Sequence, residues 1–244
     1  MIIIPDIHGR VFWKEALKHK KPGEIIIFLG DYVDPYPQEG ISLLDAVSNF
    51  EEILEEKKKN PDEIVLLIGN HDLMYMHPDH NKCSCRHDYT NEPKITKLLC
   101  GEETKDLYQM SYVKEICGVT YVFSHSGIHE DWVRRHENIF GEYQSIPESA
   151  KIANSLFKNK DDRFYISLLE PSNYRGGWEN TGSMVWADVR ERESEEEGEE
   201  GVYQIFGHTQ LTDSPIIDKS FADLDCRKPF YINEDTGELK ELEI

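Results

Sequence analysis

Short apolar runs that end in polar side chains recur along this chain. Five of them have the length of a β-strand and are rich in Ile, Val, Phe or Tyr: residues 1–5, 24–29, 63–68, 119–123 and 202–206. Runs that are apolar throughout are typical of strands covered on both faces. An Asp, Asn or His follows each run within two residues, in most cases beside a glycine that permits a sharp turn. The pattern therefore predicts strands whose carboxyl ends carry polar side chains.

Helical patterns lie between several of these runs. Residues 10–20 place apolar side chains among charges, and residues 42–59 repeat apolar side chains at helical spacing. Ser42 can cap the second helix, Asp45 completes a capping-box-like start, and lysines crowd its carboxyl end. Strands that alternate with helices indicate an α/β architecture. Because ligands bind beyond the carboxyl ends of the strands in open α/β sheets, we expect the polar clusters to share one site.

The segment after Gly207 has a different pattern. Turn residues separate four short strand-like pieces, at residues 214–218, 220–226, 228–233 and 238–244. This pattern predicts a β-meander that completes a second sheet. The expected fold is α/β, with two mixed β-sheets packed as a sandwich and flanked by helices. No internal repeat or long linker divides the chain, so we expect a single domain over residues 1–244.

Composition narrows the possible partners. The chain has 244 residues and a formal net charge of −20. This charge disfavours binding to nucleic acid, because the protein has few cationic side chains with which to displace the counterions of the phosphate backbone. No apolar run approaches the ~18 residues of a membrane span, and the amino-terminal run lacks the basic flank of a signal peptide. Five cysteines without framework spacing favour a reducing cytoplasm. We expect a cytoplasmic protein that binds neither nucleic acid nor membrane, of undetermined oligomeric state.

Glutamates dominate residues 191–201. A run of like charges cannot bury itself and is extended by its own repulsion, so the segment predicts a flexible, solvated acidic loop. An acidic docking site for a basic partner is the alternative.

The polar side chains after the five runs form a set of possible metal ligands: Asp6, His8, Asp31, Asp34, Asn70, His71, His125 and His208. Carboxylate, imidazole and amide groups without cysteine suit borderline divalent ions such as Mn, Fe or Zn. One carboxylate can bridge two ions, and two ions about 3.5–4 Å apart favour in-line displacement at phosphorus. For any one of these histidines alone, a buried and purely structural role is the alternative.

Five short motifs occur in order: "DIHG" (6–9), "GDYVD" (30–34), "GNHD" (69–72), "HSG" (125–127) and "GHT" (207–209). With them the chain resembles the calcineurin-like metallophosphoesterases, and within these the branch of phosphoprotein phosphatases and symmetrical dinucleoside-tetraphosphate hydrolases. Each motif is weak alone, whereas five in family order, each after a predicted strand, are a specific signal. The resemblance implies a metal-dependent phosphatase, a hydrolase of phosphate esters.

The resemblance also implies a role for each matching residue. His71 and Asp34 would form an acid pair, in which the imidazolium protonates the leaving oxygen while the carboxylate orients it. The implied cofactors are two divalent ions, Mn in the first place with Fe or Zn as alternatives, and the implied nucleophile is a hydroxide that bridges them. The implied ligands are Asp6 and His8 for the first metal, Asp31 for both metals, and Asn70, His125 and His208 for the second.

Three features depart from the pattern of this branch. Gln210 stands where many relatives have a second histidine, as expected for protein phosphatases, and residues 176–190 match the branch only loosely. Pro35 stands where a phosphate-binding arginine is expected, so another cation must bind the phosphate. Arg86 and Arg175 are the substrate-binding candidates, ahead of Arg10, which directly follows the first motif. A structural role is the alternative for each arginine.

Residues 77–88 gather possible zinc ligands: His77, His80, Cys83, Cys85 and His87. A zinc site needs four such ligands at suitable spacing. The spacing here is cramped, which favours a substrate-facing loop with incidental cysteines.

Three functions are compatible with the motifs. The leading hypothesis is a phosphomonoesterase that resembles the serine/threonine protein phosphatases and acts on a phosphorylated protein or a small phosphate ester. The alternative is a nucleotide hydrolase that cleaves a phosphoanhydride, such as that of diadenosine tetraphosphate. Both use the same metal core, and they differ in loops that match the family least. The third hypothesis is a non-catalytic scaffold of the same fold, suggested by the missing arginine at position 35.

Overall fold

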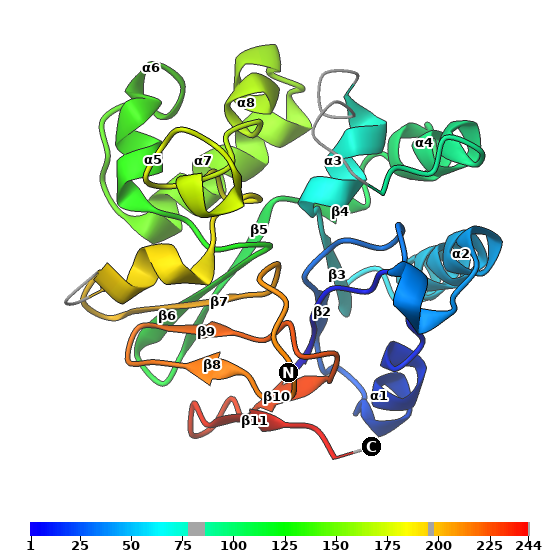
Figure 1. Cartoon of the computed structure of the whole chain (residues 1–244). Helices are drawn as coiled ribbons and strands as arrows, with labels where there is room; N and C mark the ends of the chain where they lie inside the picture. Colours follow the sequence, from blue (N-terminus) through cyan, green and yellow to red (C-terminus); the bar gives the residue numbers. More distant parts are fainter. Residues whose placement is uncertain (78–85, 195–197, 244) are drawn as a thin grey trace. The chain divides into compact units, whose positions relative to one another are not determined.

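A computed structural model of the chain describes residues 1–77, 86–194 and 198–243 (Figure 1). The chain forms two compact units. The first unit comprises residues 1–108, 227–233 and 238–244, and the second comprises residues 109–226 and 234–237. Each unit contains one mixed β-sheet and its own helices. The prediction of two mixed sheets with flanking helices is therefore confirmed, whereas the single domain and the sandwich packing stay predictions.

The first unit is built on a six-stranded sheet in the order β11-β10-β1-β2-β3-β4. Strands β1, β2 and β3 are parallel neighbours, and β10 pairs antiparallel with β1. Its elements are β1 (Ile2–Ile4), α1 (Trp13–His19), β2 (Ile26–Phe28), η1 (Pro37–Glu39), α2 (Leu43–Lys59), β3 (Ile64–Leu67), α3 (Asn70–Met76), α4 (Glu92–Cys100), β4 (Tyr108–Gln109), β10 (Phe230–Ile232) and β11 (Leu239–Glu241).

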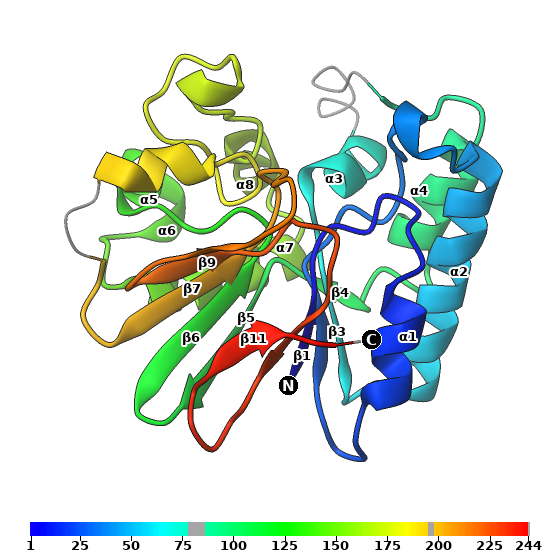
Figure 2. The ribbon, with the colours of Figure 1, turned by 60° about the horizontal axis from the view of Figure 1, so that its bottom comes forward.

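The sequence patterns of the first unit become buried strands and an amphipathic helix. Every residue of β1 and β2 is buried, as continuous apolar runs predict. Helix α2 begins after Ser42, whose hydroxyl accepts the N–H of Asp45 at 3.0 Å. Its buried face contacts β3, and Figure 2 shows α1 and α2 on the same side of these strands. Helix α1 begins three residues later than the pattern of residues 10–20 predicted.

The second unit is built on a five-stranded sheet in the order β5-β6-β7-β9-β8. Strands β6, β7 and β9 run parallel, and β5 and β8 are antiparallel to their neighbours. Its elements are β5 (Ser111–Ile116), β6 (Val119–Ser124), α5 (Glu130–Arg135), α6 (Glu137–Phe140), α7 (Ile146–Lys158), α8 (Asp162–Ser167), η3 (Asn173–Arg175), η4 (Val189–Ser194), β7 (Val202–Phe206), β8 (Ile216–Ile217) and β9 (Phe221–Asp223).

The prediction of one C-terminal β-meander is wrong. The four strand-like pieces are strands, but β8 and β9 belong to the sheet of the second unit, and β10 and β11 belong to that of the first. Strand β9 pairs parallel with β7, which requires a crossover connection, and β10 pairs with β1, more than 200 residues earlier. Turn residues mark where strands end, but they carry no information about such distant partners.

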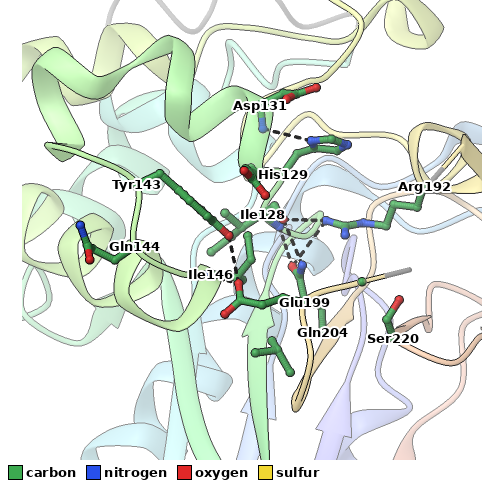
Figure 3. Close-up of a pocket in the computed structure, with 13 residues that line it drawn as sticks. Ile128, His129, Asp131, Tyr143, Gln144, Ile146, Arg192, Glu199, Gln204 and Ser220 are labelled. Carbon is green, nitrogen blue, oxygen red and sulfur yellow. Dashed lines mark hydrogen bonds between the residues drawn. The ribbon is translucent and has the colours of Figure 1, made fainter. Parts of the chain in front are cut away.

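The acidic segment begins with two buried residues, whereas residues 198–201 are exposed, and the flexible loop stays a prediction. Glu191 is buried, and its carboxylate accepts the N–H groups of Gly182 at 2.9 Å and Asp188 at 2.5 Å. Arg192 is also buried and donates to the carbonyl of Ile128 at 3.0 Å (Figure 3). Hydrogen bonds from main-chain N–H groups of neighbouring turns thus stabilise a buried carboxylate that the acidic composition predicted to be solvated. Residues 195–197 lie outside the described part of the chain.

The far end of the same segment is attached to helix α7. The Glu199 carboxylate accepts the N–H of Ile146, the first residue of α7, at 2.7 Å and the hydroxyl of Tyr143 at 2.9 Å (Figure 3). An acidic side chain at a helix N-terminus binds N–H groups that have no partner within the helix.

Among the described residues, no helix is long and apolar enough to cross a membrane.

Candidate metal centre

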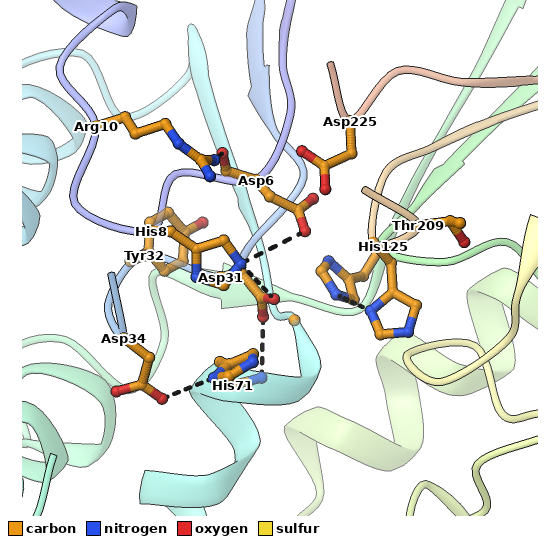
Figure 4. A network of polar contacts seen from close by, with 12 residues as sticks. Asp6, His8, Arg10, Asp31, Tyr32, Asp34, His71, His125, Thr209 and Asp225 are labelled. Carbon is orange, nitrogen blue, oxygen red and sulfur yellow. Dashed lines mark hydrogen bonds and ion pairs between the residues drawn. The ribbon is translucent and has the colours of Figure 1, made fainter. Parts of the chain in front are cut away.

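The parallel strands of the first unit deliver its polar side chains to one edge of the sheet. Asp6 and His8 follow β1, Asp31 and Asp34 follow β2, and Asn70 and His71 open helix α3 directly after β3. Parallel strands end on the same edge, so the motifs of this unit meet there, as Figure 4 shows for Asp6, His8, Asp31, Asp34 and His71. All six side chains are buried. Six of the predicted site residues therefore lie together within this unit.

The loops of this cluster hold each other in strained conformations. His8, Asp31 and Asp34 have φ angles of 42°, 53° and 59°, in the left-handed region that non-glycine residues rarely adopt. Hydrogen bonds cross between the loops, from the N–H of His8 to the carbonyl of Asp31 at 2.6 Å and from Gly9 to Tyr32 at 3.1 Å. Backbone strain of about 1–3 kcal/mol per residue persists where the surroundings fix it, commonly at functional sites.

Gly69 is required because two loops touch. A Cβ atom at this position would lie 2.1 Å from Oδ1 of Asp31. The absence of a side chain lets the Asp31 carboxylate reach the start of α3, where it accepts the N–H of His71 at 2.9 Å. The glycine of "GNHD" thus brings the second and third motifs together.

Asp72 organises the cluster without being one of the predicted site residues. It is fully buried, and its carboxylate accepts the N–H groups of Asp31 at 2.8 Å, Tyr32 at 3.1 Å and Gly69 at 2.8 Å. Burial and the charge of Asp31 raise the pKa of Asp72 to about 8, and these N–H groups oppose the rise. A sequence signal existed, because an acidic residue three positions after a helix N-cap is typical of a capping box.

His8 and Asp31 have the chemistry of metal ligands. The Nδ1 of His8 lies 2.9 Å from the carbonyl oxygen of Val33, which it can only approach as a donor, so Nε2 faces the carboxylates. That Nε2 lies 3.4 Å from Oδ2 of Asp31 and 3.9 Å from Oδ2 of Asp6. Burial lowers the pKa of His8 well below its ordinary value, so the imidazole is neutral and Nε2 carries a lone pair. A carbonyl that fixes the tautomer is typical of histidine ligands.

A cation fits the electrostatics of this cluster. Burial, with the nearby charge of Asp6, raises the pKa of Asp31 to about 7, because an ionised carboxylate is poorly solvated there. A divalent ion would reverse this penalty. One donor atom each from His8, Asp31 and His71 lie within 4.8 Å of one another. This mixed set of oxygen and nitrogen donors suits Mn, Fe or Zn.

Asp34 and His71 form a hydrogen-bonded pair at the side of the cluster. Oδ2 of Asp34 lies 2.7 Å from Nδ1 of His71 (Figure 4). The guanidinium of Arg86 donates to Nε2 of His71 at 3.0 Å and to the carbonyl of Asp34 at 2.8 Å. In this arrangement Nε2 of His71 accepts from the guanidinium, and the ring proton lies on Nδ1, facing Asp34.

Arg86 contacts the residues on both sides of Pro35, the position at which the sequence lacks the expected arginine. Its guanidinium stacks 3.7 Å from the ring centre of Tyr36, the residue after that proline. The ring of Tyr36 also packs edge-on against His8, with ring centres 5.0 Å apart. Tyr36 thus links the arginine to a proposed ligand, a contact that the sequence analysis missed. Arg10 has a different role, because its guanidinium pairs with both oxygens of Glu39 at 2.8 Å.

The second unit brings together the two remaining histidines. His125 follows β6 and His208 follows the parallel strand β7, and both are buried. Nε2 of His125 lies 3.1 Å from Nδ1 of His208, and the N–H of Gly207 donates to the carbonyl of His125 at 2.8 Å. His208 has a φ of 70°, again in the left-handed region. His125, which directly follows the last residue of β6, is therefore one member of a buried histidine pair.

Arg175 supports the loop that carries His208. Its guanidinium pairs with Asp188 at 2.8 Å and donates to the carbonyl of His208 at 3.3 Å and to the hydroxyl of Thr209 at 3.0 Å. Burial opposes ionisation of Asp188, but hydrogen bonds from Arg190 and the charge of Arg175 hold its pKa below the ordinary value. These contacts give Arg175 a positioning role, and its predicted contact with substrate stays a prediction.

The proposed zinc segment is only partly described. His80, Cys83 and Cys85 lie outside the described residues. His87 stacks on Tyr75, with ring centres 4.3 Å apart, and its Nε2 lies 3.4 Å from the carboxylate of Glu92. The zinc hypothesis therefore stays a prediction.

The fold and the buried carboxylate–imidazole clusters define a metal-dependent phosphatase. A sequence model of the calcineurin-like phosphoesterases matches residues 1–210, and the chain belongs to this family. The resemblance drawn from the five motifs is thereby confirmed. A comparison with curated protein sequences gave no match.

Solved structures share the fold. The chain is similar to a cold-active protein-tyrosine phosphatase of a psychrophilic Shewanella species, with a TM-score of 0.54 and 14% identity over 99% of this chain and 80% of the other. It is also similar to a protein serine/threonine phosphatase of Saccharomyces cerevisiae with similarity to human phosphatase PP5, with a TM-score of 0.51 and 14% identity over 100% of this chain and 79% of the other. At this identity the likeness concerns the fold alone.

Proposed function

We propose that the chain is a phosphomonoesterase of the serine/threonine protein phosphatase type. In this proposal two divalent ions, with Mn preferred over Fe or Zn, are held by six side chains. Asp31 would be shared by both ions, and the full set would be Asp6, His8, Asp31, Asn70, His125 and His208. Family membership supports the set, because each residue stands at its place in one of the five motifs. The predicted cytoplasmic location fits this function and stays a prediction.

The observation that carries the proposal is the group formed by Asp34, His71 and Arg86. The carboxylate binds one nitrogen of the imidazole at 2.7 Å, and the guanidinium lies 3.0 Å from the other. The side chains proposed as proton donor and as phosphate-binding cation are therefore adjacent, beside the buried carboxylates. A phosphate monoester needs both, because its leaving oxygen is basic and its phosphoryl oxygens are charged.

The chemistry follows from these side chains. When bound, the two ions lower the pKa of a water molecule and withdraw charge from phosphoryl oxygens. Such a water, after losing a proton to solvent, would form a bond to phosphorus while the bond to the leaving oxygen breaks. To act as the acid, His71 would take up a second proton on Nε2 while Arg86 turns from this nitrogen to the phosphoryl group. His71 would then transfer the Nε2 proton to the leaving oxygen and keep the proton on Nδ1. Asp34 keeps the imidazole oriented and stabilises its charge, and Arg86 binds the phosphoryl group.

The test is a substrate panel on the purified chain. The chain would be loaded in turn with Mn²⁺, Fe²⁺ and Zn²⁺ and assayed on phosphoserine peptides, p-nitrophenyl phosphate and diadenosine tetraphosphate. We expect turnover of the first two substrates, fastest with Mn²⁺. An Asp31→Asn preparation measures contaminating phosphatases. Turnover of the dinucleotide alone would replace the proposal by the nucleotide-hydrolase alternative.

A further inference from the structure

Tyr75 contacts Asp34 at the carboxylate oxygen that does not face His71. It lies on α3, four residues after His71, and its hydroxyl donates to Oδ1 of Asp34. The other carboxylate oxygen, Oδ2, faces Nδ1 of His71 at 2.7 Å. Each oxygen of Asp34 therefore has its own hydrogen-bond donor. A carboxylate held at both oxygens cannot rotate about its Cβ–Cγ bond without losing a hydrogen bond.

A hydrogen bond from the main chain orients the hydroxyl of Tyr75 toward Asp34. The main-chain N–H of Asp88 donates to this hydroxyl at 2.7 Å, so its own proton is available to Asp34. The donor belongs to a turn that Asp88 closes, since its Oδ1 accepts the N–H groups of Thr90 and Asn91, both at 3.0 Å. The chain thus forms a continuous series of hydrogen bonds from the Asp88 main chain through Tyr75 and Asp34 to His71.

The ring of Tyr75 is fixed independently of its hydroxyl. Tyr75 is 4% exposed, and its ring stacks on that of His87 at an angle of 18°. Burial and the charge of Asp34 raise the pKa of Tyr75 far above its ordinary value, so the hydroxyl remains a donor. Packing would be kept by phenylalanine at this position, whereas the hydrogen bonds would be lost.

We propose that Tyr75 is a positioning residue of the acid pair, which holds the Asp34 carboxylate in the orientation that aims His71 at the leaving oxygen. The inference rests on the acid-pair role proposed above for Asp34 and His71. Proton transfer depends steeply on orientation, and a site held loosely by its supporting residues loses rate before it loses structure. A tyrosine that only fills the core would instead affect all substrates alike.

Tyr75→Phe tests this role with two substrates. The Mn²⁺-loaded chain would be assayed on a phosphoserine peptide, whose alkoxide leaving group needs a proton, and on p-nitrophenyl phosphate, whose leaving group does not. We expect kcat to fall roughly tenfold on the peptide, the order of one hydrogen bond to a charged group. On the aryl phosphate we expect a change within about twofold. Metal content and the thermal unfolding midpoint are measured alongside.

Tyr108→Phe is the matched control. Tyr108 is also buried in the first unit, and its hydroxyl donates to the carbonyl of Leu98 at 2.8 Å. Its loss should lower stability by a similar amount but leave the ratio of the two rates unchanged. An equal loss of rate on both substrates for Tyr75→Phe, or loss of metal, overturns the inference.

The double variant Tyr75→Phe with His71→Asn separates the inference from the function on which it rests. If Tyr75 acts through His71, its removal should cause no further loss on the peptide once His71 is gone. An additive further loss overturns the role of Tyr75 alone. If His71→Asn itself shows no preference between the substrates, the acid pair is wrong and the inference falls with it.

Discussion

The two halves of the proposed metal centre are built in different ways. In the first unit, the carboxylate of Asp72 binds main-chain N–H groups of the loops after β2 and β3, and main-chain hydrogen bonds join the loop after β1 to the loop after β2. In the second unit, two histidines at the ends of β6 and β7 are joined by one main-chain hydrogen bond and supported by Arg175. The first half also contains the proposed acid pair and Arg86, whereas both ligands proposed from the second half are imidazoles.

Because of this difference, substitutions in the two halves should affect metal binding and proton transfer differently. In the first half, metal binding and proton transfer use neighbouring side chains of one buried network, so a substitution can affect either one. In the second half, the two histidines are expected to take part in metal binding alone. The comparison can be tested by substitutions that remove metal, proton transfer or phosphate binding one at a time.

The largest effect is expected for Asp31→Asn. This change removes the proposed bridging charge, and activity should fall more than about 100-fold, beyond the loss typical of an outer partner of a ligand. The fold should be kept, because the amide oxygen can still accept the N–H of His71. Metal analysis beside circular dichroism measures both. Full metal content in this variant would show that Asp31 does not bridge.

The next comparison sets a histidine of each half against the other. His71→Asn should retain metal and slow alkyl phosphates by about 10²–10⁴-fold, but p-nitrophenyl phosphate far less, because only the alkoxide needs a proton. His125→Asn should lose one metal and fail on both substrates. The measurements are metal content and the two rates. Metal loss in His71→Asn, with equal effects on both substrates, would make His71 a ligand.

Smaller effects are expected for one arginine of each half, Arg86 and Arg175. Arg86→Gln should raise KM for phosphate esters, and weaken inhibition by inorganic phosphate, about tenfold, the order of a charge-assisted hydrogen bond. Arg175→Gln should instead weaken metal binding about tenfold, since it supports the His208 loop. Steady-state kinetics and a metal titration separate the two outcomes. A KM effect confined to Arg175→Gln would reverse the assignment.

The smallest effect is expected away from both halves, at Glu199. Glu199→Ala removes the acceptor for the N–H of Ile146 at the start of α7, which should lower the free energy of unfolding by about 1 kcal/mol. Activity on p-nitrophenyl phosphate should not change. Denaturant unfolding measures the first and the aryl phosphate assay the second. Lost activity would link the acidic segment to the site.

The sequence by itself determined the strands, their polar ends and the family. Continuous apolar runs predict buried strands because a strand covered on both faces has no polar side, and His8, Asp31 and His71 could be predicted to meet because parallel strands end on one edge. The helix over 42–59 was predictable for a local reason, since its cap and its apolar face lie within the segment itself. Helix α3 was missed, because it is short and its residues also form a motif.

Only the tertiary structure decided what depends on distant partners. The sheet to which β10 belongs follows from pairing with β1, and the burial of Glu191 follows from main-chain donors at positions 182 and 188. Likewise, the contact of Tyr75 with Asp34 joins residues 41 positions apart. Such contacts carry no periodic signal, because the partner's position along the chain is set by the fold and not by the local pattern. Local patterns therefore identified the candidate ligands, and tertiary packing decided which side chains hold and orient them.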